Sequence, residues 1–388
     1  MYTFQFRSPK LVFKQGCWKD IPNLCKRYGE NGLLISGSSF KRNQDIYSEL
    51  EAIFEQNDMN VQKVVRKGSE PTTNEVDGLV GVTKSGSFNW ILGIGGGSTL
   101  DLSKAVAGLT CNPHPASYYQ EGHEVELKGL PFIAVPTTAG TGSEITNNSV
   151  LIDQDKGIKK SIRGDNMIAK IALLDPTLTS TMPPEITAHT GMDALTQAIE
   201  SYVSKASNVL SDYFAERAIK ELLGFLPMAW AQGTDRKARE HVLFGSLMSA
   251  LSFSNAKLGA VHGFAHPIGV QFNFPHGLIC GVLLPHVMKY NLKGNLDTVI
   301  NKFAWIGRTV LEIEGEKPKK DARELANLAI DKIFDLLDTL ELPMSLGEMG
   351  IKSREIPNIV ADTKGSSLAN NPRETNKELL TEILKNAL

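Results

Sequence analysis

The stretch WILGIGGGS, residues 90–98, decides the fold class of this 388-residue chain. Its first five residues form an apolar run typical of a buried strand, and residues 99–109 continue in a helical pattern. Glycines between a strand and a helix let the backbone approach a phosphate, and the N–H groups and positive dipole end of the helix then face the anion. Lys104 is expected to reach that phosphate from the second helical turn. The stretch therefore predicts a dinucleotide-binding turn with contacts from Gly95, Gly96, Gly97, Ser98 and Asp101.

Short apolar runs alternate with helical patterns over the first 180 residues. This alternation is typical of βαβ units and predicts a doubly wound α/β domain, residues 1–180. The expected strands are residues 32–36, 61–65, 90–94, 132–135 and 171–175, with helices such as 43–57 and 73–84 between them. After a break at Met182-Pro183-Pro184, amphipathic patterns predict an all-helical second domain, residues 181–388. Its expected helices are 190–204, 211–231, 236–252, 322–340 and 375–387.

The composition is that of an ordinary globular protein, with 41% hydrophobic and 22% charged residues and a formal net charge of −2. This charge balance gives no reason to expect nucleic acid or a membrane surface as a partner. No apolar run reaches the roughly 20 residues of a membrane span, and no secretory signal is seen, so a cytoplasmic location is expected. The four dispersed cysteines form no CxxC pair and are expected to be free thiols that pack as small apolar groups.

A second segment, PTTAGTGSE at residues 136–144, follows another apolar run. The glycine-rich turn alone is also compatible with a plain tight turn, but hydroxyl groups and bare amides suit ribose, phosphate and carboxamide groups. This segment therefore favours a cofactor site, and its expected contacts are Thr137, Thr138, Thr141 and Ser143.

The turn SGSSFKR, residues 36–42, bears on the choice of cofactor. Folds that take NAD(H) often place an acidic residue here, on the ribose 2′-hydroxyl, and this turn has none. Small hydroxyl residues followed by Lys41 and Arg42 would hold a 2′-phosphate, so NADP(H) is favoured over NAD(H). The alternative is a merely exposed basic turn. The expected contacts are Gly37, Ser38, Ser39 and Lys41.

Three of the eight histidines, His262, His266 and His276, lie in one short stretch. His262 and His266 share a face if the stretch is helical, and His276 is expected in the next loop. Upstream, Asp193 and Gln197 share a face of a predicted helix. The set offers nitrogen and oxygen ligands to a divalent metal, with an open position for substrate. The alternative is a group of capping residues and satisfied core histidines.

Together these motifs resemble the iron-containing, or group III, alcohol dehydrogenases, which are related in fold to dehydroquinate synthase. The resemblance covers nearly the whole chain and rests on residues 95–101, 136–144, 190–196, 262–277, 284–287 and 371–373. It implies an N-terminal Rossmann-like α/β domain and an all-helical C-terminal domain, with cofactor and metal meeting in the cleft between them. It also implies a homodimer or larger homo-oligomer.

The family's metal ligands are one aspartate and three histidines, which fall here on Asp193, Gln197, His262 and His276. The chain departs from the pattern at Gln197. An amide oxygen is a weaker donor to Fe²⁺ or Zn²⁺ than imidazole, so a lower metal affinity, another metal or an empty site is expected. The resemblance also places His266 near the substrate, in proton relay or substrate orientation, and Lys159 and Leu178 near the nucleotide. The turn at 37–42 is similar to that of the NADPH-dependent butanol and aldehyde reductase branch.

We therefore expect a metal-dependent alcohol dehydrogenase or aldehyde reductase that transfers hydride between NADP(H) and a small alcohol or aldehyde. Asp193 and His266 are the expected catalytic residues. The first alternative is a metal-independent NAD(P)H reductase of an activated carbonyl, in which Gln197 contacts the substrate. A non-catalytic nucleotide-binding homologue is the second. A lyase similar to dehydroquinate synthase is disfavoured, because the late helices offer no dense basic cluster for a phosphorylated substrate.

Overall fold

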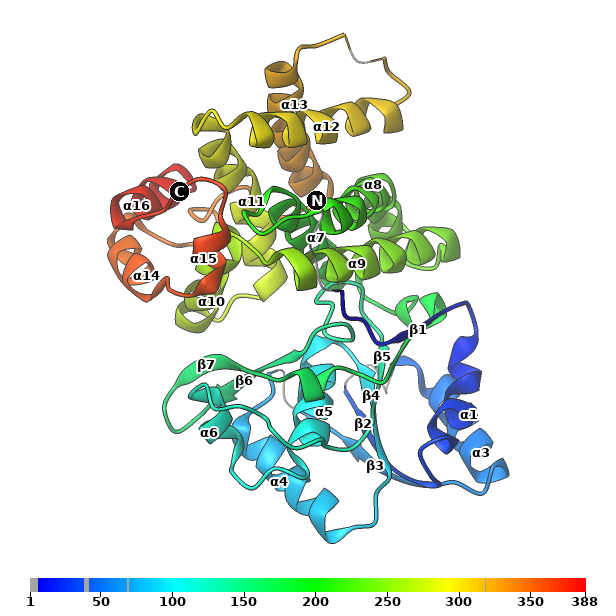
Figure 1. Cartoon of the computed structure of the whole chain (residues 1–388). Coiled ribbons are helices and arrows are strands. Elements are labelled where there is room, and N and C mark those ends of the chain that lie inside the picture. Colours follow the sequence, from blue (N-terminus) through cyan, green and yellow to red (C-terminus); the bar gives the residue numbers. More distant parts are fainter. Residues whose placement is uncertain (1–5, 38–41, 68–69, 318) are drawn as a thin grey trace. The chain divides into compact units, whose positions relative to one another are not determined.

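The computed structural model describes residues 6–37, 42–67, 70–317 and 319–388 (Figure 1). The chain forms two compact units. The α/β unit consists of Arg7–Thr138 and Gly142–Met182, and the helical unit consists of Pro183–Leu388 with Ala139–Thr141 and Phe6. The fold class is the expected one, a parallel α/β sheet domain and an all-helical domain.

Six parallel strands form the sheet of the α/β unit, in the order β1-β8-β5-β4-β2-β3. Their bounds are β1 Lys10–Phe13, β2 Asn31–Ser36, β3 Asn60–Val65, β4 Trp90–Gly95, β5 Phe132–Pro136 and β8 Ile171–Leu174. The five predicted strands are all present. The sequence patterns do not predict β1 or the antiparallel hairpin of β6 (Asn148–Asp153) and β7 (Ile158–Arg163). The reason is that β7 holds three basic residues and gives no apolar run, while the apolar runs of β1 and β6 are only three residues long.

Helices cover both faces of this sheet (Figure 1). On one face lie α1 (Ile21–Lys26) and α3 (Gln44–Gln56), and on the other lie α4 (Thr73–Ser85), α5 (Gly97–Leu109) and α6 (Ala116–Gln120). Successive side chains of a strand point to opposite faces. Leu33 and Ile35 therefore pack in the core under α4 and α5, whereas Leu34 packs in the core under α3.

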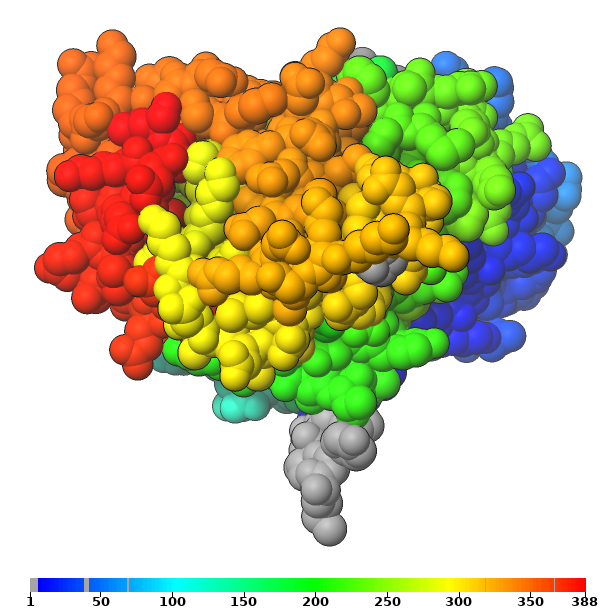
Figure 2. Space-filling model, turned by 90° about the horizontal axis from the view of Figure 1, so that it is seen from above, coloured from blue at the N-terminus to red at the C-terminus, as the bar shows by residue number. Residues whose placement is uncertain are grey.

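The helical unit is built around α7. The helix bounds are α7 Pro184–Val203, α8 Val209–Ala231, α9 Arg236–Ala256, α10 Ala260–Phe272, α11 His276–Lys293, α12 Asp297–Ile313, α13 Ala322–Thr339, α14 Ile356–Asp362, α15 Ser366–Asn370 and α16 Lys377–Asn386. α7 is buried along most of its length and packs on α8, α9 and α11. The five helices predicted for this part are present as α7, α8, α9, α13 and α16. In the space-filling view of Figure 2, the red C-terminal residues lie beside the orange segments before them, where α14 packs on α16.

Local capping chemistry fixes several helix starts. The Asn208 side chain accepts hydrogen bonds from the Leu210 and Ser211 amides at the start of α8. At α13, Asp321 and Glu324 form the reciprocal capping box expected from their spacing. Among the described residues, no helix combines the length and apolar character needed to cross a lipid bilayer.

Trp90 anchors the middle of the sheet. Its side chain is fully buried, stacks on Phe54 of α3 at a centroid distance of 6.0 Å, and donates a hydrogen bond from Nε1 to the Gly29 carbonyl at 3.0 Å. We expect Trp90→Ala to lower the free energy of unfolding by about 3–5 kcal/mol, because a cavity adds to the lost burial of the ring. Urea denaturation followed by circular dichroism measures this loss. Trp90→Phe keeps the stacking and should cost clearly less, whereas an alanine variant as stable as the wild type would contradict this role.

Candidate functional site

Most of the predicted cofactor residues follow the ends of neighbouring parallel strands. β8, β5, β4 and β2 lie side by side, with Gly95 in register with Pro136. After β2 the chain places β3 on one side of it and β4 on the other, so the direction in which strands are added reverses between β2 and β4. Open α/β sheets bind ligands at the carboxyl ends of the strands where this direction reverses. At this edge stand Gly37, Gly95, Gly96, Gly97, Ser98, Thr137, Thr138 and Leu178. The expected contacts Ser38, Ser39 and Lys41 lie outside the described residues.

The glycine-rich turn brings neighbouring backbone segments close together. A Cβ on Gly95 would lie 2.7 Å from the Thr99 side chain, and a Cβ on Gly37 would lie 2.4 Å from the Thr99 hydroxyl. The Thr137 amide donates to the Gly95 carbonyl at 2.9 Å. The Thr137 hydroxyl is buried and has no hydrogen-bond partner within the described ranges. Since the first N–H groups of α5 lack helical acceptors, as at any helix start, this edge can bind an anion.

Lys104 does not point to this edge. Its side chain is fully buried, and Nζ donates to Ser143 Oγ (3.1 Å), Thr146 Oγ1 (3.0 Å) and the Asn148 carbonyl (2.7 Å). Burial lowers the pKa of Lys104 to about 8, although nearby carboxylates act in the opposite direction. The expectation that Lys104 reaches a phosphate is therefore wrong. Its ammonium group instead holds the loop after β5 and the start of β6.

Three further predicted residues have partners inside the α/β unit. The Ser143 hydroxyl donates to Asp101 Oδ1 at 2.5 Å, and the Val150 amide donates to Asp101 Oδ2 at 3.1 Å. Lys159 on β7 forms an ion pair with Glu70, with Nζ and Oε1 3.1 Å apart. These contacts tie the hairpin and the loop after β5 to the rest of the unit. The predicted contact Thr141 is exposed.

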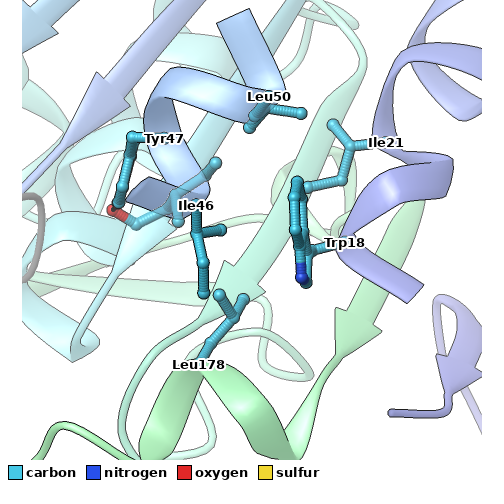
Figure 3. A pocket seen from close by; sticks show the side chains of 7 residues that line it. Trp18, Ile21, Ile46, Tyr47, Leu50 and Leu178 are labelled. Atoms are coloured by element: carbon cyan, nitrogen blue, oxygen red, sulfur yellow. Dashed lines mark hydrogen bonds between the residues drawn. The ribbon is translucent and has the colours of Figure 1, made fainter. Parts of the chain in front are cut away.

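Leu178 lies in the wall of a small apolar pocket (Figure 3). The pocket has a volume of about 10 Å³, and the other lining residues are Trp18, Ile21, Ile46, Tyr47, Leu50 and Ile94. The Tyr47 hydroxyl donates to the Ile94 carbonyl at 3.3 Å, which satisfies the polar group at this wall. A cavity of this size has room for about one water molecule, so the part that Leu178 plays here is apolar packing.

Glu144 supplies a pH-dependent contribution to stability. It is buried, and burial raises its pKa from 4.5 to about 7, against the effects of its own amide and of Lys104. Because the folded-state pKa lies above the unfolded value, this contribution is full below pH 4.5 and is lost as the pH rises through about 7. We therefore expect Glu144→Gln to lose less stability than the wild type between about pH 5 and about pH 8. Thermal unfolding across this range measures the difference. Glu185→Gln, at an exposed carboxylate of α7, is the control, and parallel curves for Glu144→Gln and wild type would contradict the prediction.

Four potential metal ligands come together inside the helical unit. They are Asp193 of α7, His262 of α10, and His276 and Cys280 of α11, and one ligand atom of each lies within 4.8 Å of the others. Asp193 Oδ1 is 3.4 Å from His262 Nε2 and 3.8 Å from His276 Nε2. Cys280 Sγ is 3.8 Å from His262 Nε2 and 3.6 Å from His276 Nε2. Cys280 is not among the ligands expected from the sequence, where it counts as a packing group.

Close packing of α11 on α7 positions this cluster. A Cβ on Gly277 would lie 2.1 Å from the His189 carbonyl oxygen, and a Cβ on Gly281 would lie 3.0 Å from Met192 Cβ. His276 is the first residue of α11 rather than part of a loop, which corrects the expectation. His276 and Cys280 therefore share one helix face, and this i, i+4 spacing is the signal that would have revealed Cys280.

Glu200, which the sequence patterns also did not single out, orients His262. Its Oε2 lies 2.6 Å from His262 Nδ1, and its Oε1 accepts a hydrogen bond from the Val261 amide at 2.6 Å. A proton on Nδ1 that is shared with Glu200 leaves the Nε2 lone pair of His262 toward Asp193. The signal for Glu200 is its place seven residues after Asp193, on the same face of α7.

The groups of the cluster stabilise one another's charges. Burial by itself raises the pKa of Asp193, but His262 and His276 outweigh it and lower the pKa. Burial by itself lowers the pKa of both histidines, but Cys280 and Asp193 outweigh it and raise the pKa. The two imidazoles also lower the pKa of the Cys280 thiol against the effect of burial. Mutual shifts of this kind are typical of functional sites.

The residues of the cluster fit a divalent metal. Asp193 Oδ1 and Gln197 Oε1 are buried, and neither has a hydrogen-bond partner in the part of the chain that the structure describes. Gln197 is 4% exposed and lies one helical turn after Asp193. A cation bound beside these oxygens and the imidazole nitrogens would satisfy them. His266 is exposed, and its ring centroid lies 5.4 Å from that of His276, so it is adjacent to the cluster without belonging to it.

Comparison with known proteins points to one family. Residues 8–176 match the family model described as iron-containing alcohol dehydrogenase, and residues 187–388 match that of the C-terminal part of the Fe-containing alcohol dehydrogenase family. The chain is 30% identical to the NAD-dependent methanol dehydrogenase of Bacillus methanolicus over 99% of both chains. It is 34% identical to the 1,3-propanediol dehydrogenase of Citrobacter freundii over 92% of both. A crystal structure of 1,3-propanediol oxidoreductase matches with a TM-score of 0.92 and 28% identity, over 100% of both chains.

Proposed function

Since the chain belongs to the iron-containing alcohol dehydrogenase family of NAD(P)-dependent oxidoreductases acting on CH–OH groups, we propose that it interconverts a small aldehyde and its alcohol. The reaction is direct hydride transfer to or from C4 of the nicotinamide of NADP(H). The observation that carries the proposal is the cluster of buried Asp193, buried His262 and half-buried His276 on three packed helices. A divalent metal at this cluster supplies Lewis-acid stabilisation of charge on the substrate oxygen.

The residues in and around the cluster have different proposed roles. Asp193, His262 and His276 would hold Fe²⁺ or Zn²⁺, and Gln197 is the fourth ligand candidate from the family pattern. Glu200 would keep a proton on His262 Nδ1, so that the lone pair of Nε2 can bind the metal. We assign His266 to proton relay or substrate orientation, which its exposure beside His276 supports.

Asp193→Ala tests the metal role directly. We expect kcat/KM for aldehyde reduction to fall by about 1000-fold, because the variant loses an anionic ligand and the charge stabilisation that depends on it. The Kd for NADPH should stay nearly unchanged, since all the predicted cofactor residues except Thr141 lie in the α/β unit. Steady-state kinetics and fluorescence titration measure the two quantities. Glu185→Ala on the exposed start of α7 is the matched control. Unchanged turnover in Asp193→Ala would remove Asp193 from the mechanism.

The unpartnered Gln197 oxygen favours a second candidate, a metal-independent reductase in which Gln197 contacts an activated carbonyl substrate. The Gln197 Oε1 atom can accept a hydrogen bond from a hydroxyl of the substrate, or of its alcohol product, without a metal. Elemental analysis combined with activity after exhaustive chelation separates the two candidates. Full activity of metal-free protein would favour this second one.

For the cofactor, we propose contacts from the glycine-rich turn, the threonines after β5 and the turn after β2. The residues are Gly37, Ser38, Ser39, Lys41, Gly95, Gly96, Gly97, Ser98, Asp101, Thr137, Thr138, Thr141, Ser143, Lys159 and Leu178. Eight of them, Gly37, Gly95, Gly96, Gly97, Ser98, Thr137, Thr138 and Leu178, lie at one edge of the sheet, which supports their part of the set. Ser38, Ser39 and Lys41 lie outside the described residues, and Asp101, Thr141, Ser143 and Lys159 are included from the sequence motifs and the family resemblance. The preference for NADP(H) is supported by the basic residues and the absence of an acid in the sequence of the turn at 36–42.

Ser38→Asp tests the preference for NADP(H). A carboxylate in this turn would repel the 2′-phosphate, so we expect kcat/KM with NADPH to fall by about tenfold or more while that with NADH falls less or rises. Steady-state kinetics with both cofactors measure the ratio, and Ser38→Ala should keep the wild-type preference. A wild-type enzyme that prefers NADH would contradict this part of the proposal.

We further propose a homodimer or larger homo-oligomer working in a reducing, cytoplasmic environment. Exposed apolar side chains at the start of α8, Val209 at 50% and Tyr213 at 68%, offer a surface for self-association. All four cysteines are free thiols, which suits a reducing compartment.

A further inference from the structure

We propose that Cys280 is a metal ligand of this enzyme and that it supplies, as a thiolate, the strong donor that the amide at Gln197 does not. The inference rests on the proposed function, in which the cluster of Asp193, His262 and His276 holds a divalent metal. It adds a sulfur ligand that the family's pattern of one aspartate and three histidines lacks. The consequence is a softer site that selects Zn²⁺ over Fe²⁺.

The distances within the cluster support a four-ligand site. Zinc bonds of about 2.0–2.3 Å to oxygen, nitrogen and sulfur place the ligand atoms of a tetrahedron roughly 3.3–3.7 Å apart. The four separations between Asp193 Oδ1 or Cys280 Sγ and the two histidine Nε2 atoms are 3.4, 3.8, 3.8 and 3.6 Å. The Cys280 thiol therefore already lies about where a fourth protein ligand belongs, and the substrate oxygen would then bind as a fifth ligand, since catalytic zinc sites can expand to five-coordinate.

The helices leave the Cys280 thiol little other role. Cys280 is fully buried, and its Sγ lies 3.8 Å from His262 Nε2 and 3.6 Å from His276 Nε2, the same atoms that would face the metal. It lies one turn after His276 on α11, so the helix that presents one ligand presents the other on the same face. Gly281, next in the chain, brings this turn against Met192 and hence against the turn of α7 that carries Asp193.

The donor chemistry predicts which ion the site selects. Zinc takes imidazole, thiolate and carboxylate donors in proteins, and a thiolate favours it over harder ions, which prefer sites of oxygen ligands alone. A thiol must lose its proton to coordinate, so metal binding releases the Cys280 proton to solvent. The remaining donor of the family pattern, at Gln197, is a neutral amide oxygen and is the weakest of the set.

Titration of the metal-free, full-length enzyme with Co²⁺ tests the proposal, because Co²⁺ occupies zinc sites and reports its ligands by absorption. We expect visible bands typical of tetrahedral Co²⁺ together with an intense near-ultraviolet band from thiolate-to-cobalt charge transfer. In Cys280→Ser the near-ultraviolet band should disappear, and the Kd for Co²⁺ should rise by about 100-fold or more, because loss of a direct ligand costs at least as much as the roughly 100-fold that loss of an outer-shell partner can cost. Cys111→Ser, which removes the exposed thiol, is the matched control and should keep the band.

The outcomes separate this inference from the proposed function. Visible cobalt bands without the near-ultraviolet band would overturn thiolate ligation while leaving the metal site in place. The absence of any cobalt binding would overturn both. A band that is lost in Cys111→Ser and kept in Cys280→Ser would also overturn the role of Cys280. The wild-type spectrum decides the question even where Cys280→Ser does not fold, and Cys280→Ala then serves as the second variant.

Discussion

The tight approach of α11 to α7 at Gly277 is the constraint on which the metal-ligand cluster depends. Any side chain at position 277 would collide with the His189 carbonyl oxygen, a backbone atom that cannot rotate away. Because α11 begins at His276, this contact fixes the first turn of α11 against the segment of α7 that carries Asp193. The ligands then come from packed helices of one unit, and their separations follow from helix packing rather than from loop conformation.

A buried charge has a comparable role in the α/β unit. The Lys104 ammonium group lies in the interior, where an unpaired charge would cost several kcal/mol, and it has three acceptors in the loop after β5 and in β6. Asp101, one turn earlier on α5, accepts from Ser143 of the same loop. The two side chains therefore allow few arrangements of the loop that carries the expected cofactor contacts. Close backbone packing holds the glycine-rich turn in place. The loop after β5 is held by its hydrogen bonds to the buried ammonium group of Lys104.

Many of the elements that the sequence predicts correctly have a strong hydrophobic pattern, whereas α9 and β3 have only a weak one. Buried parallel strands such as β4 are continuous apolar runs, and helices such as α13 present one apolar face. The strands of the hairpin, of which β7 is charged and partly exposed, lack that property. α11 is also difficult to predict, because it is buried on most sides and contains Pro285, so its pattern has no clear period.

That α11 was not predicted from the sequence also explains which site residues could be predicted. The residue spacing and the family resemblance both lead to Asp193, His262 and His276, but Cys280 becomes visible only once α11 is known to begin at His276. Lys104 shows the opposite error, because a pattern places a lysine on a helix without telling whether its side chain points to the sheet edge or into the interior.

The cluster departs from the family pattern at Gln197 and at Cys280, and the charge balance of the site relates these two departures. An amide at position 197 removes a strong donor, and a thiol at position 280 adds one from the neighbouring helix. With Asp193 and a Cys280 thiolate, the ligand set carries two negative charges, which balance a divalent cation in a buried site where uncompensated charge is costly. Two imidazoles complete the set without adding charge. Glu200 is then not needed to balance the charge of the metal, so its two oxygens can hold His262 Nδ1 and the Val261 amide, each at 2.6 Å.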